Sequence, residues 1–419
     1  MPSIKEKLYK LDTGKQEKAR ETQQFDPEQL QSIQATLKHT QRGLCISREK
    51  RFSLDFTHGP YTLETFLHIP KTVFDLLAKE ILSREFNPKS VVFLDTETTG
   101  LAGGTGTYAF IIGVGFFEKN EFKIQQFFLP DYDYESAQLY ELAELLASKS
   151  ALITFNGKSY DIPLLKNRFI LNKINLEWES YTHIDLLHTS RRLWGRQIGS
   201  CSLQNIEQAI LKIKRKGDIP GAEIPQLYFD YLIHKDLPTL LDVFKHNVID
   251  LLSLLSISVS ASQLFTHPVG GTVNQDFHSA LRTFISLNRY KQAHLFIEKL
   301  PGQICFQPEI LYSRALLYKR MQDWESALEC FRLIVKKDRH RFIDAYIEIA
   351  KLYEHKFKDY RAALDTLNEL EDRIRMIREL RDKNIFDNKA IQYRRDRLYR
   401  KIAADDRNTL KSNGIDTDS

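Results

Sequence analysis

The sequence predicts an α/β chain in which a mixed β-sheet flanked by helices is followed by an all-helical C-terminal region. Three observations predict this fold class. Short apolar runs that end in polar residues recur between about 90 and 190, as buried strands do. Helical patterns alternate with the later of these strands. Beyond about residue 270 the strand signals stop, and small residues recur at a regular spacing.

Length and composition set the limits of this prediction. A chain of 419 residues exceeds the size of one hydrophobic core, so two or more domains are expected. The four cysteines lie far apart and form no Cys-x-x-Cys pair, which favours reduced thiols over disulfides or zinc ligands. The N-terminus has no apolar targeting segment, and we predict a cytoplasmic protein without membrane contact. The net charge of +5 is compatible with a polyanionic partner but does not require one.

The change of pattern along the chain divides it into four parts. Residues 1–85 form an N-terminal extension of unknown role, with a helix predicted from Lys71 to Ser83. The sheet domain covers 86–265, helical repeats cover 272–370, and a charged helical cap with a polar tail covers 371–419.

The sheet domain is predicted to begin with three antiparallel strands. SVVFLDTET from Ser90 has the apolar character of a central strand, and AFIIGVGFFE and EFKIQQFFLP follow it. Lys119-Asn120 separates the last two as a tight hairpin turn. Helix YESAQLYELAELLASKS, strand ALITFNGKSYD, a helix with Pro163 in its first turn, a strand at SYTHID and a long helix after Pro238 complete the pattern.

The C-terminal region shows a repeat of alanines. One series, at steps of 34 and 36 residues, consists of Ala293, Ala327 and Ala363. The other, at steps of 35 residues, consists of Ala280, Ala315 and Ala350. Small residues at this period allow paired antiparallel helices to pack closely, and the arrangement resembles three tetratricopeptide repeats. Such a surface could bind a protein or nucleic-acid partner, or simply support the sheet domain. The arginines beyond 371 fit a solvated helix better than a phosphate-binding patch.

Three groups of polar residues carry the candidate chemistry. Asp95 and Glu97 alternate at the end of a buried strand, so both leave the same face, where paired carboxylates favour a hard divalent cation. Asp161 follows the next apolar strand, either as a site residue at the sheet edge or as a helix cap. His246 and Asp250 lie one turn apart on a helix and can address one cluster, and Asp242 lies one further turn back.

Together these groups resemble the DEDD exonuclease superfamily of the ribonuclease-H-like fold. Its motifs are Asp-x-Glu, Asn-x-x-x-Tyr/Phe-Asp, and either Tyr-x-x-x-Asp or His-x-x-x-x-Asp. The first matches at Asp95 and Glu97, and the second matches from Asn156 through Tyr160 to Asp161. The third departs, because His246 has the residue type of one subclass and the spacing of the other. This departure bears on the role of His246 as general base. It does not affect the expectation that Asp250 is a metal ligand.

A closer resemblance is to the YprB-like bacterial proteins, which carry a divergent domain of this fold followed by helical repeats. The runs TETTGLAGGTGTYAFIIGVGFF, SCSLQNIE, GDIPGAEIPQLYFDYL and HNVIDLLSL carry it. The resemblance implies a ribonuclease-H-like mixed sheet and a metal-dependent nuclease acting on nucleic acid, with a 3′→5′ exonuclease as the first expectation. A structure-selective endonuclease and a catalytically silent binding scaffold are the alternatives.

The same resemblance assigns roles to individual residues. Two Mg²⁺ or Mn²⁺ ions, about 4 Å apart, would be held by Asp95, Glu97, Asp161 and Asp250, and His246 could accept the proton of the attacking water. Substrate contacts are expected from Thr98, Asn156 and Tyr160, and from Gly104 and Thr105 in a glycine-rich loop that lacks the lysine of a phosphate-binding loop.

Other polar residues near these motifs are interpreted as structural. Asp185 is a fifth acid at a strand-to-helix junction, where we favour a structural role over a ligand role. A set of basic residues could contact phosphates, although solvated surface is the expected fate of most of them: Arg191, Arg192, Arg196, Lys212, Lys214, Arg215 and Lys216.

Overall fold

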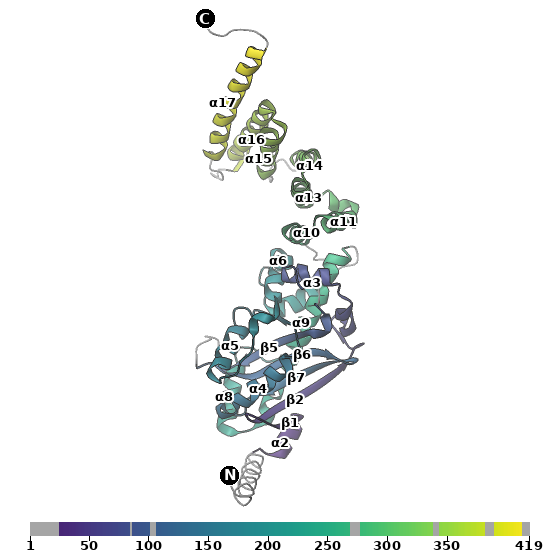
Figure 1. The fold of residues 1–419 in the computed structure, drawn as a ribbon, viewed down its shortest axis with the longest axis vertical. Coiled ribbons are helices and arrows are strands. Elements are labelled where there is room, and N and C mark those ends of the chain that lie inside the picture. The colour runs from purple at the N-terminus through teal and green to yellow at the C-terminus, as the bar shows by residue number, and fades with distance from the viewer. Residues whose placement is uncertain are drawn as a thin grey trace, which may run out of the picture. The chain divides into compact units, whose positions relative to one another are not determined.

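The chain folds into two compact units, residues 1–276 and 277–419 (Figure 1). The structure is a computed structural model, and it describes residues 25–83, 86–100, 106–268, 277–337, 343–381 and 389–412. The predicted loop residues Gly104 and Thr105 lie outside these ranges.

A seven-stranded mixed sheet forms the centre of the first unit, in the order β1-β2-β7-β6-β5-β8-β9 (Figure 1). Strands β5, β6 and β7 are antiparallel neighbours, and β8 and β9 continue parallel to β5. This arrangement confirms the predicted mixed sheet. The bounds are β5 Val91–Thr98, β6 Ala109–Glu118, β7 Glu121–Phe128, β8 Ala151–Thr154 and β9 Thr182–Asp185.

Two strands that the sequence analysis did not predict extend this sheet from the N-terminal side. Strand β2 (Gly43–Ser53) pairs antiparallel with β7, and β1 (Ala35–Thr40) covers the edge of β2. The run of charged residues from Arg48 to Arg51 hides the strand pattern, because most of these side chains are exposed. The residues before 86 therefore contribute to the sheet that carries the candidate site.

Helices cover both faces of the sheet (Figure 1). Helices α4 (Glu135–Leu146) and α5 (Asp161–Leu171) pack in the apolar cluster of Val92, Leu94 and Ile112. Helix α8 (Ile224–His234) and the start of α9 (Leu241–Thr266) pack with Phe110 and Phe128 in a second cluster. The alternation of side chains along each strand supplies both cores.

Shorter elements complete the first unit. Helix α3 (Lys71–Ala78) ends at Lys79, which adopts a left-handed conformation with φ 60°, so the helix is shorter than the predicted Lys71 to Ser83. The remaining elements are α2 Pro27–Ser32, β3 Thr57–His58, β4 Tyr61–Thr62, η1 Leu63–His68, η2 Pro88–Ser90, η3 Tyr132–Tyr134, η4 Trp178–Ser180, α6 Leu186–Ile198, α7 Leu203–Ile206, η5 Glu207–Leu211 and η6 Leu237–Leu240.

One helical stretch among the described residues, Leu237–Thr266, is long and apolar enough to cross a membrane by length and composition. Its most apolar window is 83% buried inside the protein. Core helices pass the same test, and here the stretch packs against β5, β6 and α3. Its apolar character is thus explained by its position in the core.

The second unit consists of helix pairs. Each alanine of the predicted repeat is fully buried, with 0% exposure, in one helix of a pair. Helix α16 continues beyond residue 370, where we had placed the end of the repeats. The elements are α10 Phe277–Ser286, α11 Tyr290–Glu298, α12 Gly302–Cys305, α13 Pro308–Arg320, α14 Trp324–Lys337, α15 Ile343–Leu352, η7 Tyr353–Phe357, α16 Tyr360–Arg381 and α17 Lys389–Ser412.

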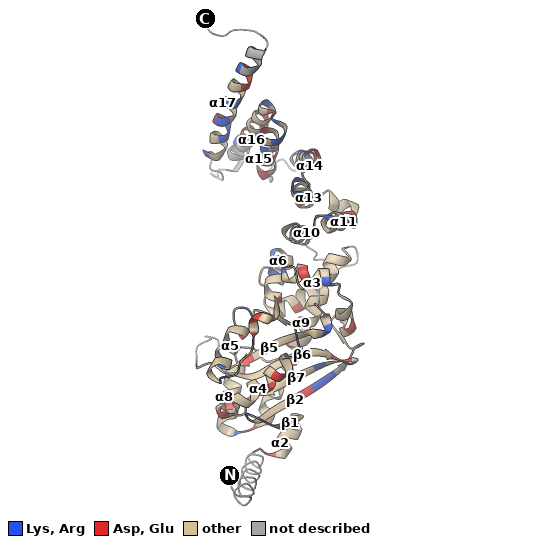
Figure 2. Cartoon of the chain, viewed as in Figure 1, with Lys and Arg blue, Asp and Glu red and all other residues tan. Residues whose placement is uncertain are grey.

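Basic residues along α17 hold that helix to the rest of the unit (Figure 2). The fully buried carboxylate of Glu354 accepts hydrogen bonds from Arg394 at 2.8 Å, Arg397 at 2.7 Å and Lys401 at 2.8 Å. Arg395 pairs with Glu371. These basic side chains are only partly exposed, and each is paired with a carboxylate of the same unit, because a buried carboxylate requires paired charges.

Glu354→Gln is expected to loosen α17 in a pH-dependent way. Burial alone would raise the pKa of Glu354, but hydrogen bonds from Arg397 and Lys401 lower this pKa to about 2. A lowered folded-state pKa stabilises the fold above about pH 4.5, and this stabilisation is lost as the pH falls toward 2. We expect the variant to lose about 2–3 kcal/mol at neutral pH and almost nothing near pH 2.

Hydrogen exchange of α17 peptides in increasing urea measures this loss. Asp406→Asn is the matched control, because its ion pair with Arg361 is exposed and such pairs contribute about 0–1 kcal/mol. Equal protection of α17 in the wild type and in Glu354→Gln at pH 7 would contradict the prediction.

Candidate metal centre

Strand β5 aims two carboxylates at helix α9. Asp95 lies opposite Gly113 of β6, and Glu97 lies two residues further along, on the same face. A register irregularity between Glu97 and Thr98 marks the point where regular pairing with β6 ends. The apolar run before Asp95 fixes β5 in the core between β6 and β8, and the polar residues follow at the C-terminal end of the strand.

Asn247 of α9 fixes the orientation of Asp95. Its Nδ2 donates to Asp95 Oδ2 at 2.8 Å, and its Oδ1 accepts from Nε2 of Gln126 at 2.8 Å. All of these side chains are well shielded, and Asn247 has 0% exposure. The sequence analysis missed Asn247, although it stands next to His246 in the quoted HNVIDLLSL run.

Gly113→Ala is expected to displace Asn247. A Cβ at residue 113 would lie 2.0 Å from Asn247 Oδ1 and 2.7 Å from its Cγ. Because the neighbouring Gln126 holds Asn247 in place, we expect a loss of about 1–3 kcal/mol of stability, as for other overpacked cores. Urea unfolding measures it. A variant as stable as the wild type would mean that the Asn247 contact is not fixed.

Asp161 reaches the same region from the opposite side of β5. It is the first residue of α5, and its Oδ1 accepts a hydrogen bond from the Thr96 hydroxyl at 2.5 Å. The alternative that Asp161 caps α5 is not what the structure shows, because the N-cap is Tyr160 and makes no side-chain cap bond. The connection from β8 to α5 therefore directs Asp161 toward β5.

The third motif forms an ion-pair network at Asp250. Asp250 Oδ1 accepts from Arg215 Nη2, and Asp250 Oδ2 lies 3.7 Å from Nε2 of His246. Nδ1 of His246 donates to Asp218 Oδ1 at 2.8 Å. Glu207 holds Arg215 from the other side, with its Oε2 2.7 Å from Nε and its Oε1 2.5 Å from Nη2.

Arg215 is thus neither a surface residue nor a phosphate contact. Only 6% of its side chain is exposed. Glu207 comes from the SCSLQNIE run and Asp218 from the GDIPGAEI run, which the sequence analysis quoted without assigning them a role. The signal for these residues was present in the runs themselves, but their convergence on Asp250 depends on the tertiary fold.

Mutual repulsion marks the four motif carboxyls as one cluster. Burial, and then the charges of Asp250, Glu97 and Asp161, raise the pKa of Asp95 well above its ordinary value. Burial, Asp250 and Asp161 do the same to the pKa of Glu97. Burial also raises the pKa of Asp161 to about 6. It raises the pKa of Asp250 as well, and the positive charge of Arg215 partly offsets that rise.

The donor set fits a divalent cation. In the described part of the chain, the 9% exposed carboxylate of Glu97 has no hydrogen-bond or ion-pair partner. Buried carboxylates without counter-charge are costly, and hard divalent cations prefer oxygen ligands. No three His, Cys, Asp or Glu side chains among the described residues already stand in metal-site geometry. Instead, one carboxylate oxygen each of Asp95, Asp161 and Asp250 accepts a hydrogen bond from a protein side chain.

Comparison with known proteins finds two similarities. The model of the RNase_H superfamily matches residues 92–262. The matched residues include all four motif acids. The chain is also 29% identical over 326 residues to the uncharacterized protein YprB of Bacillus subtilis (strain 168), covering 76% of this chain and 78% of that protein.

Two of the predicted substrate residues, Thr98 and Tyr160, meet at the end of β5. The buried Thr98 hydroxyl donates to Gly100 O at 3.0 Å and lies 3.2 Å from Tyr160 Oη. Tyr160 also donates to Gly100 O. Asn156 is exposed and adopts φ 65°, a left-handed conformation that asparagine tolerates. Its backbone carbonyl accepts from Tyr160 N at 3.1 Å, which closes the turn before Asp161.

Asp185 has a structural role. Its carboxylate accepts backbone N–H groups of Asn156 at 2.9 Å, Lys158 at 3.0 Å and Leu187 at 2.9 Å. It therefore caps α6 and holds the turn before Asp161, as the structural interpretation predicted. Asp242, by contrast, is exposed and pairs with Lys245.

The basic residues near the domain divide between core and surface. Arg192 donates to the backbone oxygens of Leu76 and Leu77 and is not available to phosphate. Arg191 is exposed, and it lines a cavity of about 440 Å³ together with Asn156. Arg196, Lys212, Lys214 and Lys216 are also exposed.

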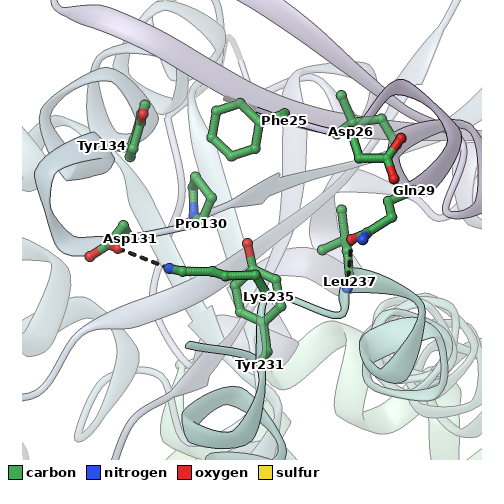
Figure 3. A pocket seen from close by; sticks show the side chains of 10 residues that line it. Phe25, Asp26, Gln29, Pro130, Asp131, Tyr134, Tyr231, Lys235 and Leu237 are labelled. Atoms are coloured by element: carbon green, nitrogen blue, oxygen red, sulfur yellow. Dashed lines mark hydrogen bonds and ion pairs between the residues drawn. The ribbon is translucent and has the colours of Figure 1, made fainter. Parts of the chain in front are cut away.

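Another cavity, of about 390 Å³, opens beside the end of β7 (Figure 3). Lys235 reaches across it to Asp131 with 3.0 Å between Nζ and Oδ2, and Gln29 accepts from Leu237 N at 3.1 Å. Phe25 and Tyr134 pack edge to face at its wall. None of the candidate metal ligands lines this cavity, so we separate it from the site.

Proposed function

We propose that this chain is a divalent-metal-dependent nuclease that hydrolyses phosphodiester bonds of nucleic acid and releases nucleotides from the 3′ end. The observation that supports the proposal is that Asp95, Glu97, Asp161 and Asp250 lie near enough for their charges to raise the pKa of Asp95 and Glu97, within the residues that match the RNase_H superfamily model. These four acids come from β5, α5 and α9. The basic groups beside them do not supply enough positive charge to balance their carboxylates.

The charge balance supports cation binding. Arg215 is the guanidinium that contacts this group of acids, and it already contacts Glu207, Asp218 and Asp250. The carboxyl groups that share the site are Asp95, Glu97, Asp161, Glu207, Asp218 and Asp250. One guanidinium cannot neutralise this set, whereas two Mg²⁺ or Mn²⁺ ions would bring it close to neutrality.

The residues of the chain would divide the work. Asp95, Glu97, Asp161 and Asp250 would hold the ions, and Asn247 keeps Asp95 in a ligating orientation. Bound divalent ions supply electrostatic stabilisation of the phosphate and lower the pKa of water. His246, which lies between Asp218 and Asp250, would take up the proton of the attacking water. Thr98 and Tyr160 would contact the terminal nucleotide.

Digestion of 5′-labelled RNA and DNA oligonucleotides tests the proposal. With Mn²⁺ we expect a ladder of products shortened from the 3′ end, which EDTA abolishes and Asp95→Asn does not produce. Asp242→Asn is the matched control, because Asp242 lies on α9 but is exposed and paired with Lys245.

The other outcomes separate the alternatives. Cleavage of a closed circular substrate would replace the exonuclease by an endonuclease on the same site. Binding of Mn²⁺ and oligonucleotide without any cleavage would leave a silent binding scaffold. Cleavage that persists in EDTA or in Asp95→Asn would remove the proposed metal centre.

A further inference from the structure

We infer that Arg215 competes with a cation for Asp250, so that the proposed metal sites fill in order. The inference rests on the proposed metal-dependent function and deepens it. It assigns Arg215 as a positioning residue that acts through Asp250 and sets the affinity of the second metal ion.

Both oxygens of Asp250 face basic groups. Arg215 Nη2 donates to Oδ1, and His246 Nε2 lies 3.7 Å from Oδ2. Asp95 and Glu97 have no such contact with a basic side chain among the described residues. An ion held by Asp95, Glu97 and Asp161 therefore has carboxylate oxygens to bind, whereas an ion that needs Asp250 must first displace the guanidinium.

Arg215 can release Asp250 without losing its other partners. Its Nε donates to Glu207 Oε2 at 2.7 Å, its Nη1 to Asp218 Oδ2 at 2.9 Å and its Nη2 also to Glu207 Oε1 at 2.5 Å. Three donor contacts thus remain when the contact with Asp250 is broken. A buried guanidinium that kept no partner would be costly, so this anchoring makes Asp250 the exchangeable partner.

Space for this movement exists on the far side of the guanidinium. A cavity of about 320 Å³ is lined by Arg215 itself and by Glu207, Asp218, Gln204 and Gly217. Gly217 and Lys216 are exposed, so the segment that carries Arg215 borders solvent. The guanidinium can move toward this cavity while it stays bonded to Glu207 and Asp218.

The consequence is a coupling between the guanidinium and the second ion. A ligand shifts an equilibrium by its differential affinity for the two states, and Arg215 stabilises the state in which Asp250 is not a ligand. Removing Arg215 should therefore strengthen the second site by about tenfold or more, within the usual range of coupling between sites. The first site should change much less.

The coupling is tested by titrating the full chain with Mn²⁺. Calorimetry and the electron paramagnetic resonance of free and paired Mn²⁺ follow the binding. In the wild type we expect one stronger and one weaker site. Arg215→Gln should strengthen the weaker site, and Arg215→Lys, which keeps the charge, should leave it weak. Lys214→Gln is the matched control: it removes the charge of an exposed neighbour and should have no effect.

A second variant protects the test against misfolding. Arg215→Gln leaves the buried carboxylate of Glu207 with the Ser253 hydroxyl but without its guanidinium partner. Glu207→Gln/Arg215→Gln therefore removes both charges, and circular dichroism checks both proteins. An unchanged second site in the folded variants, or an equal gain in Arg215→Lys, would overturn the inference. Mn²⁺ binding that survives Asp95→Asn would instead overturn the proposed metal centre.

Discussion

Asp95→Asn is expected to abolish cleavage and at the same time to raise the thermal stability of the metal-free protein. The loss of activity should be at least about 10³-fold, because the electrostatic contribution of a metal ligand is removed. The gain in stability should be about 1 kcal/mol or more, because a carboxyl whose pKa is raised by burial and by neighbouring acids is replaced by a neutral group of similar shape. Function and stability therefore change in opposite directions.

The sign of the stability change follows from the pKa. Burial and the neighbouring acids raise the folded-state pKa of Asp95 well above that of the unfolded chain. Such a group makes folding less favourable as the pH rises above its unfolded value of about 3.8. The asparagine variant does not titrate. Its advantage should thus grow as the pH rises above about 3.8 and should vanish below that pH.

Thermal melts with and without Mn²⁺ measure both effects. Mn²⁺ should stabilise the wild type, since it binds the folded state, and should not stabilise Asp95→Asn. A metal-free variant that melts below the wild type at pH 7 would show that Asp95 is a compensated structural acid. In that case the site is not strained by its own charges.

Asp185→Ala is expected to have the opposite signature, with lower stability and retained metal binding. The substitution removes the acceptor of three backbone N–H groups, which belong to Asn156, Lys158 and Leu187. Leaving the buried N–H of Leu187 without a partner costs about 1–3 kcal/mol, and the partly buried N–H groups of Asn156 and Lys158 cost less, so we expect a total loss of about 2–4 kcal/mol. The affinity for Mn²⁺ should fall far less than in Asp95→Asn.

Urea unfolding and Mn²⁺ titration of the same variant separate the two roles of Asp185. Ser202→Ala is a matched control, because Ser202 caps the short helix α7 through one N–H and is exposed. Its loss should be about 0.5–2 kcal/mol. If Asp185→Ala keeps its stability and loses Mn²⁺ binding, Asp185 is a metal ligand and not a cap.

Local patterns were sufficient for much of the first unit. The apolar run before Asp95 predicted β5, and the Lys119-Asn120 turn predicted the hairpin of β6 and β7, because both depend on residues close in sequence. Strand β2 was missed, since its charged outer residues break the expected alternation. In the second unit, the spacing of the buried alanines predicted the helix pairs.

The candidate site divides in the same way. Asp95, Glu97, Asp161 and Asp250 could be named from motifs, because each motif is short and follows a recognisable strand or lies on a recognisable helix. Asn247, Glu207 and Asp218 stand in runs that carry the resemblance, but they could not be assigned a role, because their contacts with Asp95 and Arg215 depend on the tertiary fold. Arg215 was expected at the surface, since a basic cluster usually is solvated.

The sequence by itself determined the mixed sheet, the paired helices and the identity of the acids, because periodicity and motif spacing are properties of neighbouring residues. Only the tertiary structure decided that Arg215 lies against Asp250, that Asn247 holds Asp95 and that Asp185 is a cap. These facts depend on which side chains share a buried volume. Segments far apart in the chain together determine these contacts, because each buried charge needs a compensating partner.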